Sequence, residues 1–413
     1  MISKLENEYK FFYISFLIIV FANIFYFYTY FINANVNKFF DLLLGSHIFF
    51  SIFFLIHKFN FKNFFYKNSL YGLLIVYSLA QLLRPPADNY ELIINNYWFS
   101  KFGGVLFDTI FLLPFFYLWS YFRDSVYWFE KISLLSIKIG IILFPVCYYY
   151  DVKYIWTAFY PIYYLLIGYN YSNTKRKIWI ILGFLISNYI FIIENYRSGI
   201  VKNLLVILAL IILSIKLKKI NKIFLYSLVF FPILVIILFW LNDQLTFYHF
   251  LKTIQFLPEN FTVDTRTFIY QDLISHFKSS GNLFFGDGGF GNYYSIYMDN
   301  WRNALDNLSG DNKFRPGAEV GILNIFLKGG IILFLLIFLI IIKGVNFSYD
   351  NSKNGYVYKL NFVVAIHFMY MSIANIYIFN LNTIGFWIII GIISNAKINT
   401  LEENDIKTIF KKL

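Results

Sequence analysis

The stretch that decides the fold runs from Ile223 to Leu241 and reads IFLYSLVFFPILVIILFWL. It contains no charged residue, and as an α-helix it is long enough to cross the roughly 30 Å core of a bilayer. Similar apolar runs recur along the 413 residues, of which 59% are hydrophobic and only 14% charged. Because no soluble fold of this length buries so much apolar surface, the composition excludes a soluble globular protein.

The other apolar runs predict an all-α, polytopic integral membrane protein with about twelve transmembrane helices. The first run is followed by no small-residue cleavage site, so we expect a retained anchor rather than a removable signal peptide. No internal repeat is found, and 1–413 is predicted to be a single transmembrane domain. The expected spans are 11–32, 39–57, 69–83, 102–122, 132–150, 154–170, 178–194, 200–215, 223–241, 318–342, 360–380 and 383–395.

The Lys and Arg residues alternate between the loops and orient the spans. Four of them, Lys216, Lys218, Lys219 and Lys222, directly precede the span at 223–241. Placing both termini in the cytoplasm puts 21 Lys and Arg in the inner segments and only 5 in the short outer loops. Cytoplasmic loops typically carry such an excess. The net charge of +12 therefore indicates a lipid bilayer as partner and no nucleic acid.

The span at 223–241 is followed by one long hydrophilic segment, 242–317, which the charge asymmetry places outside, between spans nine and ten. Asp264 is a plausible N-cap, and apolar residues at i, i+4 and i+8 after it predict a short amphipathic helix. Arg266 would lie in the first turn, where backbone N–H groups and the helix dipole favour an anion. The alternative is a solvated loop arginine. The three apolar residues are Ile269, Leu273 and Phe277.

A glycine-rich motif, Gly286-Asp287-Gly288-Gly289-Phe290-Gly291, follows in the same segment. It matches the dinucleotide pattern G-x-G-x-x-G, but it lies in an outward loop without the strand and helix that a nucleotide site needs. Two interpretations remain open for Gly286 and Gly288. They form either a flexible turn or a tight backbone turn that lets a bulky substrate approach the membrane surface.

A second candidate site is the external turn Glu194-Asn195-Tyr196-Arg197-Ser198-Gly199, with Lys202 about one helical turn further on. Arg197 stands alone at the outer membrane surface, whereas most basic residues lie on the inner side. We therefore expect a functional role for Arg197, the alternative being an anchor that extends its charge to the interface.

Glu319, at the start of the span 318–342, is the third candidate. It would enter the membrane near the outer face, which is costly unless it faces a wet cavity or a cation. It is either a site residue or a structural partner of Arg266, Arg315 or Lys328. Since no Cys or His cluster has the spacing of metal ligands, we expect no metal and no cofactor.

Three short motifs, in this order, resemble the Wzy-type O-antigen polymerase and O-antigen ligase superfamily. They are Arg197-Ser198-Gly199 at an external helix start, Arg266 followed about twenty residues later by Gly286-Asp287-Gly288, and Gly330-Ile331-Ile332. Residue-level similarity covers roughly 190–215 and 260–342, and the hydropathy profile is similar throughout. Ligases of this superfamily carry a His-Asn pair where this chain has Glu319-Val320, and the missing histidine favours a polymerase.

The resemblance implies an inverting, metal-independent glycosyltransferase of the bacterial inner membrane, with its active site on the periplasmic face. The donor would be a glycan on undecaprenyl diphosphate, with the diphosphate against Arg197 and Arg266. Glu319 would deprotonate or orient the acceptor hydroxyl. Lys202, Gly286 and Gly288 would complete the substrate site. A chain-length regulator protein is a further candidate partner. An O-antigen ligase-like transferase and a flippase or transporter are the alternatives; dissimilar halves and external arginines argue against the latter.

Overall fold

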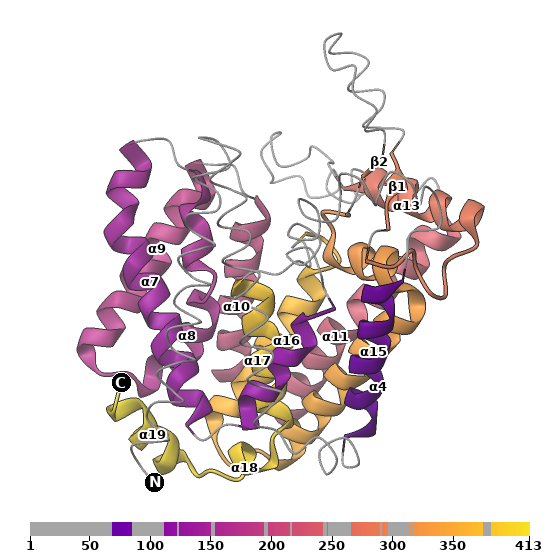
Figure 1. Ribbon diagram of the computed structural model, residues 1–413. Coiled ribbons are helices and arrows are strands. Elements are labelled where there is room, and N and C mark those ends of the chain that lie inside the picture. Colours follow the sequence, from indigo (N-terminus) through magenta and orange to yellow (C-terminus); the bar gives the residue numbers. More distant parts are fainter. Residues whose placement is uncertain are drawn as a thin grey trace.

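The described part of the computed structural model is a bundle of helices (Figure 1), and 82% of its residues are helical. It comprises residues 68–84, 111–121, 124–149, 153–193, 197–214, 217–242, 246, 266–289, 291–295, 314–315, 317–374 and 381–413. Four helices in these ranges are long and apolar enough to cross a membrane, as expected for an α-helical membrane protein. They are α7 (Ser125–Tyr149), α9 (Thr174–Ile193), α11 (Lys218–Leu241) and α15 (Gly321–Asn351). The expected spans 11–32 and 39–57 lie outside the described residues.

Shorter helices complete the bundle. They are α4 (Ser69–Leu83), α8 (Ile162–Gly168), α10 (Arg197–Ser214), α16 (Gly355–Tyr370), α17 (Leu381–Ser394), α18 (Ala396–Asn399) and α19 (Glu403–Lys411). The described ranges also contain the 3₁₀ helices η1 (Leu113–Tyr121), η2 (Lys153–Phe159) and η3 (Tyr169–Tyr171). The expected span 154–170 is therefore not one helix. It is divided between η2, α8 and η3, and α8 begins after Pro161, whose ring nitrogen carries no hydrogen for a preceding helix.

The segment predicted as a long hydrophilic loop contains α13 (Thr267–Ser280) and the strands β1 (Tyr293–Tyr294) and β2 (Phe314–Arg315). The helix expected there is present, and its three apolar residues Ile269, Leu273 and Phe277 are buried. It begins at Thr267, with Arg266 as the N-cap, and Asp264 lies outside the described residues. The helix ends where Gly281 adopts a left-handed backbone with φ of 70°.

The bundle has two distinct ends (Figure 1). One carries α13, β1 and β2 and is called the α13 end, and the other carries α18 and α19 and is called the α19 end. Hydrogen bonds gather the basic connections at the α19 end. Tyr349 donates to the Lys218 carbonyl at 2.8 Å, and Gly355 N–H donates to Glu403 Oε2 at 2.9 Å. Among the described residues, the basic connections near Lys218 and Gly355 thus lie at the α19 end.

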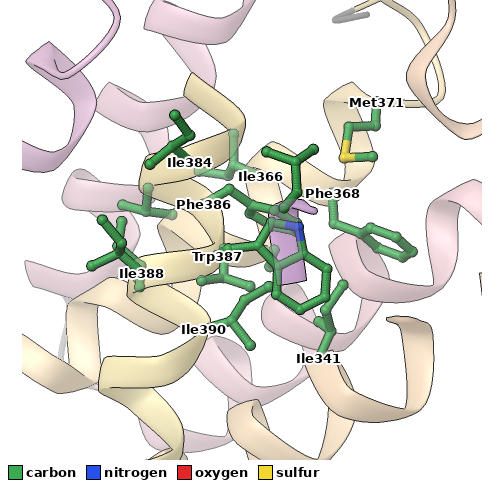
Figure 2. Close-up of a cluster of buried hydrophobic side chains, with 14 of the residues drawn as sticks. Ile341, Ile366, Phe368, Met371, Ile384, Phe386, Trp387, Ile388 and Ile390 are labelled. Atoms are coloured by element: carbon green, nitrogen blue, oxygen red, sulfur yellow. The ribbon is translucent and has the colours of Figure 1, made fainter. Parts of the chain in front are cut away.

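A cluster of buried hydrophobic side chains lies where α17 meets α15 and α16 (Figure 2). Trp387 is fully buried there, and Figure 2 shows its ring beside Phe386 of the same helix, Phe368 of α16 and Ile341 of α15. The apolar contacts surround α17 on all sides, as expected of a helix in the interior of a membrane bundle.

The α19 end contains a buried ion pair that hydropathy alone does not reveal. Arg176 Nη2 donates to Glu130 Oε2, and the Tyr356 hydroxyl donates to the other carboxylate oxygen at 2.5 Å. Both charged side chains are almost wholly buried. The amphipathic helix α19 covers them, with the Phe410 ring 4.8 Å from the guanidinium carbon of Arg176.

Candidate functional site

At the α13 end, one carboxylate is held by two arginines. Arg315 Nη2 donates to Glu319 Oε1 at 2.9 Å, and Arg266 Nη1 donates to Glu319 Oε2. The Glu319 side chain is 43% exposed and Arg266 is 29% exposed. The cluster is therefore fixed by paired hydrogen bonds and also open to a ligand from outside.

Three different elements bring this cluster together. Arg266 precedes the first turn of α13, which packs against α11, α15 and β1. Arg315 belongs to β2, and Glu319 follows four residues later. Glu319 precedes α15, which begins at Gly321, so it is not part of that helix as the expected span 318–342 implied. Of the three cations considered as its partners, the structure selects Arg266 and Arg315.

The strand pair β1 and β2 adjoins the cluster through Arg315. Tyr293 lies opposite Arg315 in the antiparallel register, and its side chain is fully buried. Burial raises the pKa of Tyr293 to about 12, and the charge of the nearby Arg315 opposes part of that rise. The hydroxyl therefore remains protonated at neutral pH. Beside it, the Ser295 hydroxyl donates to Asp272 Oδ2 at 2.5 Å.

The glycine motif forms a tight turn that fills a break in α15. Gly330 interrupts the helix with φ of 64° and ψ of −167°. Asp287 N–H donates to the Leu327 carbonyl at 2.7 Å, and Gly288 N–H donates to the Lys328 carbonyl at 3.0 Å. Beyond the break, Ile331 and Ile332 donate to the Leu283 and Phe284 carbonyls. The loop thus satisfies backbone groups that the helix leaves open.

Glycine is required on both sides of this contact. A Cβ on Gly286, whose φ is 65°, would lie 2.6 Å from the Gly330 nitrogen, and one on Gly330 would lie 2.3 Å from the Phe284 carbonyl oxygen. Gly286 and Gly288 form a tight turn with positive φ, and the approach of a substrate to that turn stays a prediction. The partner that approaches it closely is α15 itself.

Side chains from two helices hold the glycine turn in place. Lys328 is buried and donates to the Gly289 and Gly291 carbonyls at 3.0 and 2.8 Å. Arg84, at the end of α4, donates to the Gly286 carbonyl at 2.7 Å. The role of Lys328 is therefore to position the turn rather than to neutralise Glu319.

The sequence patterns did not predict a His–Asp pair that lies beside the turn. His276 Nε2 lies 2.6 Å from Asp287 Oδ2, and Asn282 donates to Asp287 Oδ1 at 2.8 Å. Because α13 ends at Ser280, before Asp287, the fold of the turn and not helical spacing brings the two residues together. The pair lies about 15 Å along α13 from Arg266 and belongs to the turn rather than to the arginine cluster.

The predicted site at the start of α10 is only partly described. Arg197 is the first residue of α10, but its side chain lies outside the described part of the chain. Lys202 is 3% exposed and donates to Asn382 Oδ1 at 3.0 Å. Its ammonium also lies 4.3 Å from the centre of the Tyr163 ring. Lys202 therefore points into the bundle and not toward the surface cluster.

The fold thus defines an α-helical chain with candidate membrane spans and an arginine–carboxylate cluster at one end. Comparisons with protein-family models, with curated proteins and with solved structures found no match.

Proposed function

We propose that the chain is a surface-polysaccharide polymerase of the bacterial inner membrane. It transfers a growing glycan from undecaprenyl diphosphate to a new lipid-linked repeat unit on the periplasmic face, with both termini in the cytoplasm. The observation that supports it is the cluster of Arg266, Arg315 and Glu319 at the end of an apolar bundle. A departing diphosphate needs cations and an acceptor hydroxyl needs a base, and the cluster offers both groups.

The proposed reaction is a direct displacement. The acceptor hydroxyl oxygen attacks the anomeric carbon from the side opposite the diphosphate and forms the new glycosidic bond. The bond from that carbon to the diphosphate oxygen breaks, and the diphosphate leaves with the electron pair. Glu319 takes the hydroxyl proton, and the anomeric configuration inverts. Arg266, with Arg197 from α10, neutralises the departing charge, so the step requires no metal.

The pairing of Glu319 has a consequence for this chemistry. In the structure its two oxygens accept from Arg266 and Arg315. A diphosphate carries more negative charge than one carboxylate, so it would compete for the same guanidiniums. Substrate binding would then release Glu319 to accept a proton. Glu319 would therefore act as the base only after the donor has bound.

The direct test is the surface-glycan ladder of a strain in which the gene is deleted and then complemented. We expect Arg266→Ala to leave glycolipid capped by a single repeat unit, at normal protein abundance. Losing one contact to a developing anion typically slows a reaction roughly a hundredfold to a thousandfold. The matched control is Lys278→Ala, because Lys278 is an exposed cation in the last turn of the same helix. We expect a full ladder from it.

The same experiment separates the alternatives. An uncapped lipid core in the deletion strain would point to a ligase, and repeat units stranded in the cytoplasm would point to a flippase. A full ladder from Arg266→Ala would remove the proposed diphosphate site. Equal losses in Arg266→Ala and Lys278→Ala would indicate that general loop charge, and not the cluster, is required.

A transporter is the second candidate, and Lys202 is the observation that favours it. Ionisable residues inside membrane bundles often mark a substrate or proton path. Lys202 is buried, and among the described residues no carboxylate forms an ion pair with it. The polymerase remains our proposal because the arginine–carboxylate cluster at the α13 end is partly exposed, whereas Lys202 is buried inside the bundle.

A further inference from the structure

The β1–β2 ladder holds two buried groups that lack a hydrogen-bond partner. By distance and angle, neither the Tyr293 hydroxyl nor Arg315 Nη1 has a hydrogen-bond partner in the described structure, although the two side chains are close enough to interact electrostatically with each other. The Tyr293 side chain is 0% exposed to bulk solvent. Buried polar atoms are nearly always paired because an unpaired one destabilises the fold. Two such atoms side by side therefore call for a functional explanation.

The geometry directs both groups toward the arginine–carboxylate cluster. Tyr293 and Arg315 are paired across the ladder, so their side chains project from the same face. Arg315 is anchored through its other nitrogen, because Nη2 donates to Glu319 Oε1 at 2.9 Å. Nη1 of Arg315 is buried beside the tyrosine and has no hydrogen-bond partner by distance and angle.

The chemistry of the two groups restricts the ligand. Tyr293 keeps its proton at neutral pH, since burial raises its pKa to about 12. Even if Arg315 Nη1 approached the tyrosine oxygen, the hydroxyl hydrogen would still need an acceptor. Both groups thus require an acceptor, and because one of them is a guanidinium, an anionic oxygen fits best.

We propose that Tyr293 and Arg315 form a subsite that binds a phosphate or diphosphate oxygen beside Glu319. The identity of the ligand rests on the proposed function, which would supply the diphosphate of the lipid-linked donor. The subsite itself rests on the two unpaired donors. Tyr293 would then be a binding residue that none of the sequence motifs includes.

The test uses the full chain in lipid nanodiscs and two probes, inorganic pyrophosphate and undecaprenyl diphosphate. We expect Tyr293→Phe to weaken binding of at least one probe by about tenfold or more, as for loss of a hydrogen bond to a charged group. Its melting temperature should stay equal or rise, because the change removes an unpaired buried hydroxyl. The control is Tyr294→Phe, because Tyr294 is the next residue of the strand and is exposed on its other face. We expect it to bind both probes as the unchanged protein does.

Each outcome separates the subsite from the proposed function. Weaker binding of either probe by Tyr293→Phe alone supports the subsite, and the probe affected distinguishes a free phosphate compound from a lipid headgroup. If that result came with a full glycan ladder from the deletion strain, the subsite would stand and the polymerase would be refuted. Unchanged binding by Tyr293→Phe would overturn the subsite, as would no binding of either probe by the unchanged protein. A lower melting temperature with unchanged affinity would assign the hydroxyl to structure alone.

Discussion

At the scale of single residues, the backbone conformation at Gly330 clearly requires glycine. Its φ of 64° and ψ of −167° are open essentially to glycine alone. We expect Gly330→Ala to lower the stability by about 1–3 kcal/mol from backbone strain, and further because the new Cβ would overlap the Phe284 carbonyl. The midpoint of thermal unfolding of the purified protein in detergent measures the loss.

Gly281 is the matched control for this prediction. It also has a positive φ, 70°, but no atom lies within 4 Å of a Cβ placed on it. We expect Gly281→Ala to cause a clearly smaller loss of stability. Equal losses in the two variants would show that the contact between the glycine turn and α15 contributes little.

The hydrogen-bond partners of Glu319 could not be predicted from the sequence. Three cations were equally plausible partners for Glu319, because hydropathy and charge spacing carry no information about side-chain direction. In the structure Arg266 and Arg315 form ion pairs with Glu319, whereas Lys328 donates to the glycine turn. The assignment of Glu319 as the base and of Arg197 as a diphosphate ligand stays a prediction.

At the scale of elements, α19 and the ion pair beneath it form one unit. Arg176→Ala would leave the Glu130 carboxylate buried without its cation, and we expect a loss of about 3–5 kcal/mol in stability. Thermal unfolding compared with Lys175→Ala, the exposed neighbouring cation, provides the check. A small effect of Arg176→Ala would mean that water reaches the pair and that α19 does not seal it.

The sequence predicted the end of a helix well where the apolar run and the helix stop at the same residue. Other helix boundaries were predicted poorly. The expected span 223–241 corresponds to α11, but the helix begins earlier, at Lys218. The reason is that the hydropathy pattern ends at the first lysine, whereas the backbone hydrogen bonds continue. The break in α15 was not predicted, because the groups that satisfy its open carbonyls come from a loop about forty residues earlier in the chain.

At the scale of the whole molecule, the two ends of the bundle should lie on opposite sides of the membrane. The test replaces Cys147, the one native cysteine, by serine and introduces Ser279→Cys in α13 or Lys411→Cys in α19. A membrane-impermeant thiol reagent added to intact spheroplasts should label only the cysteine in α13, because the basic connections gather at the α19 end. Labelling of both, or of α19 alone, would contradict the topology.

The contact between the glycine turn and α15 also constrains the order of biogenesis. Residues 283–288 leave the ribosome before residues 327–332, yet each supplies backbone partners to the other. When α15 enters the bilayer, its broken turn remains incomplete until the earlier segment folds back onto it. Under the proposed topology, translocation of that segment and final insertion of α15 would be coupled steps. A chain whose outer segment is delayed would then hold α15 as an incomplete, protease-sensitive intermediate.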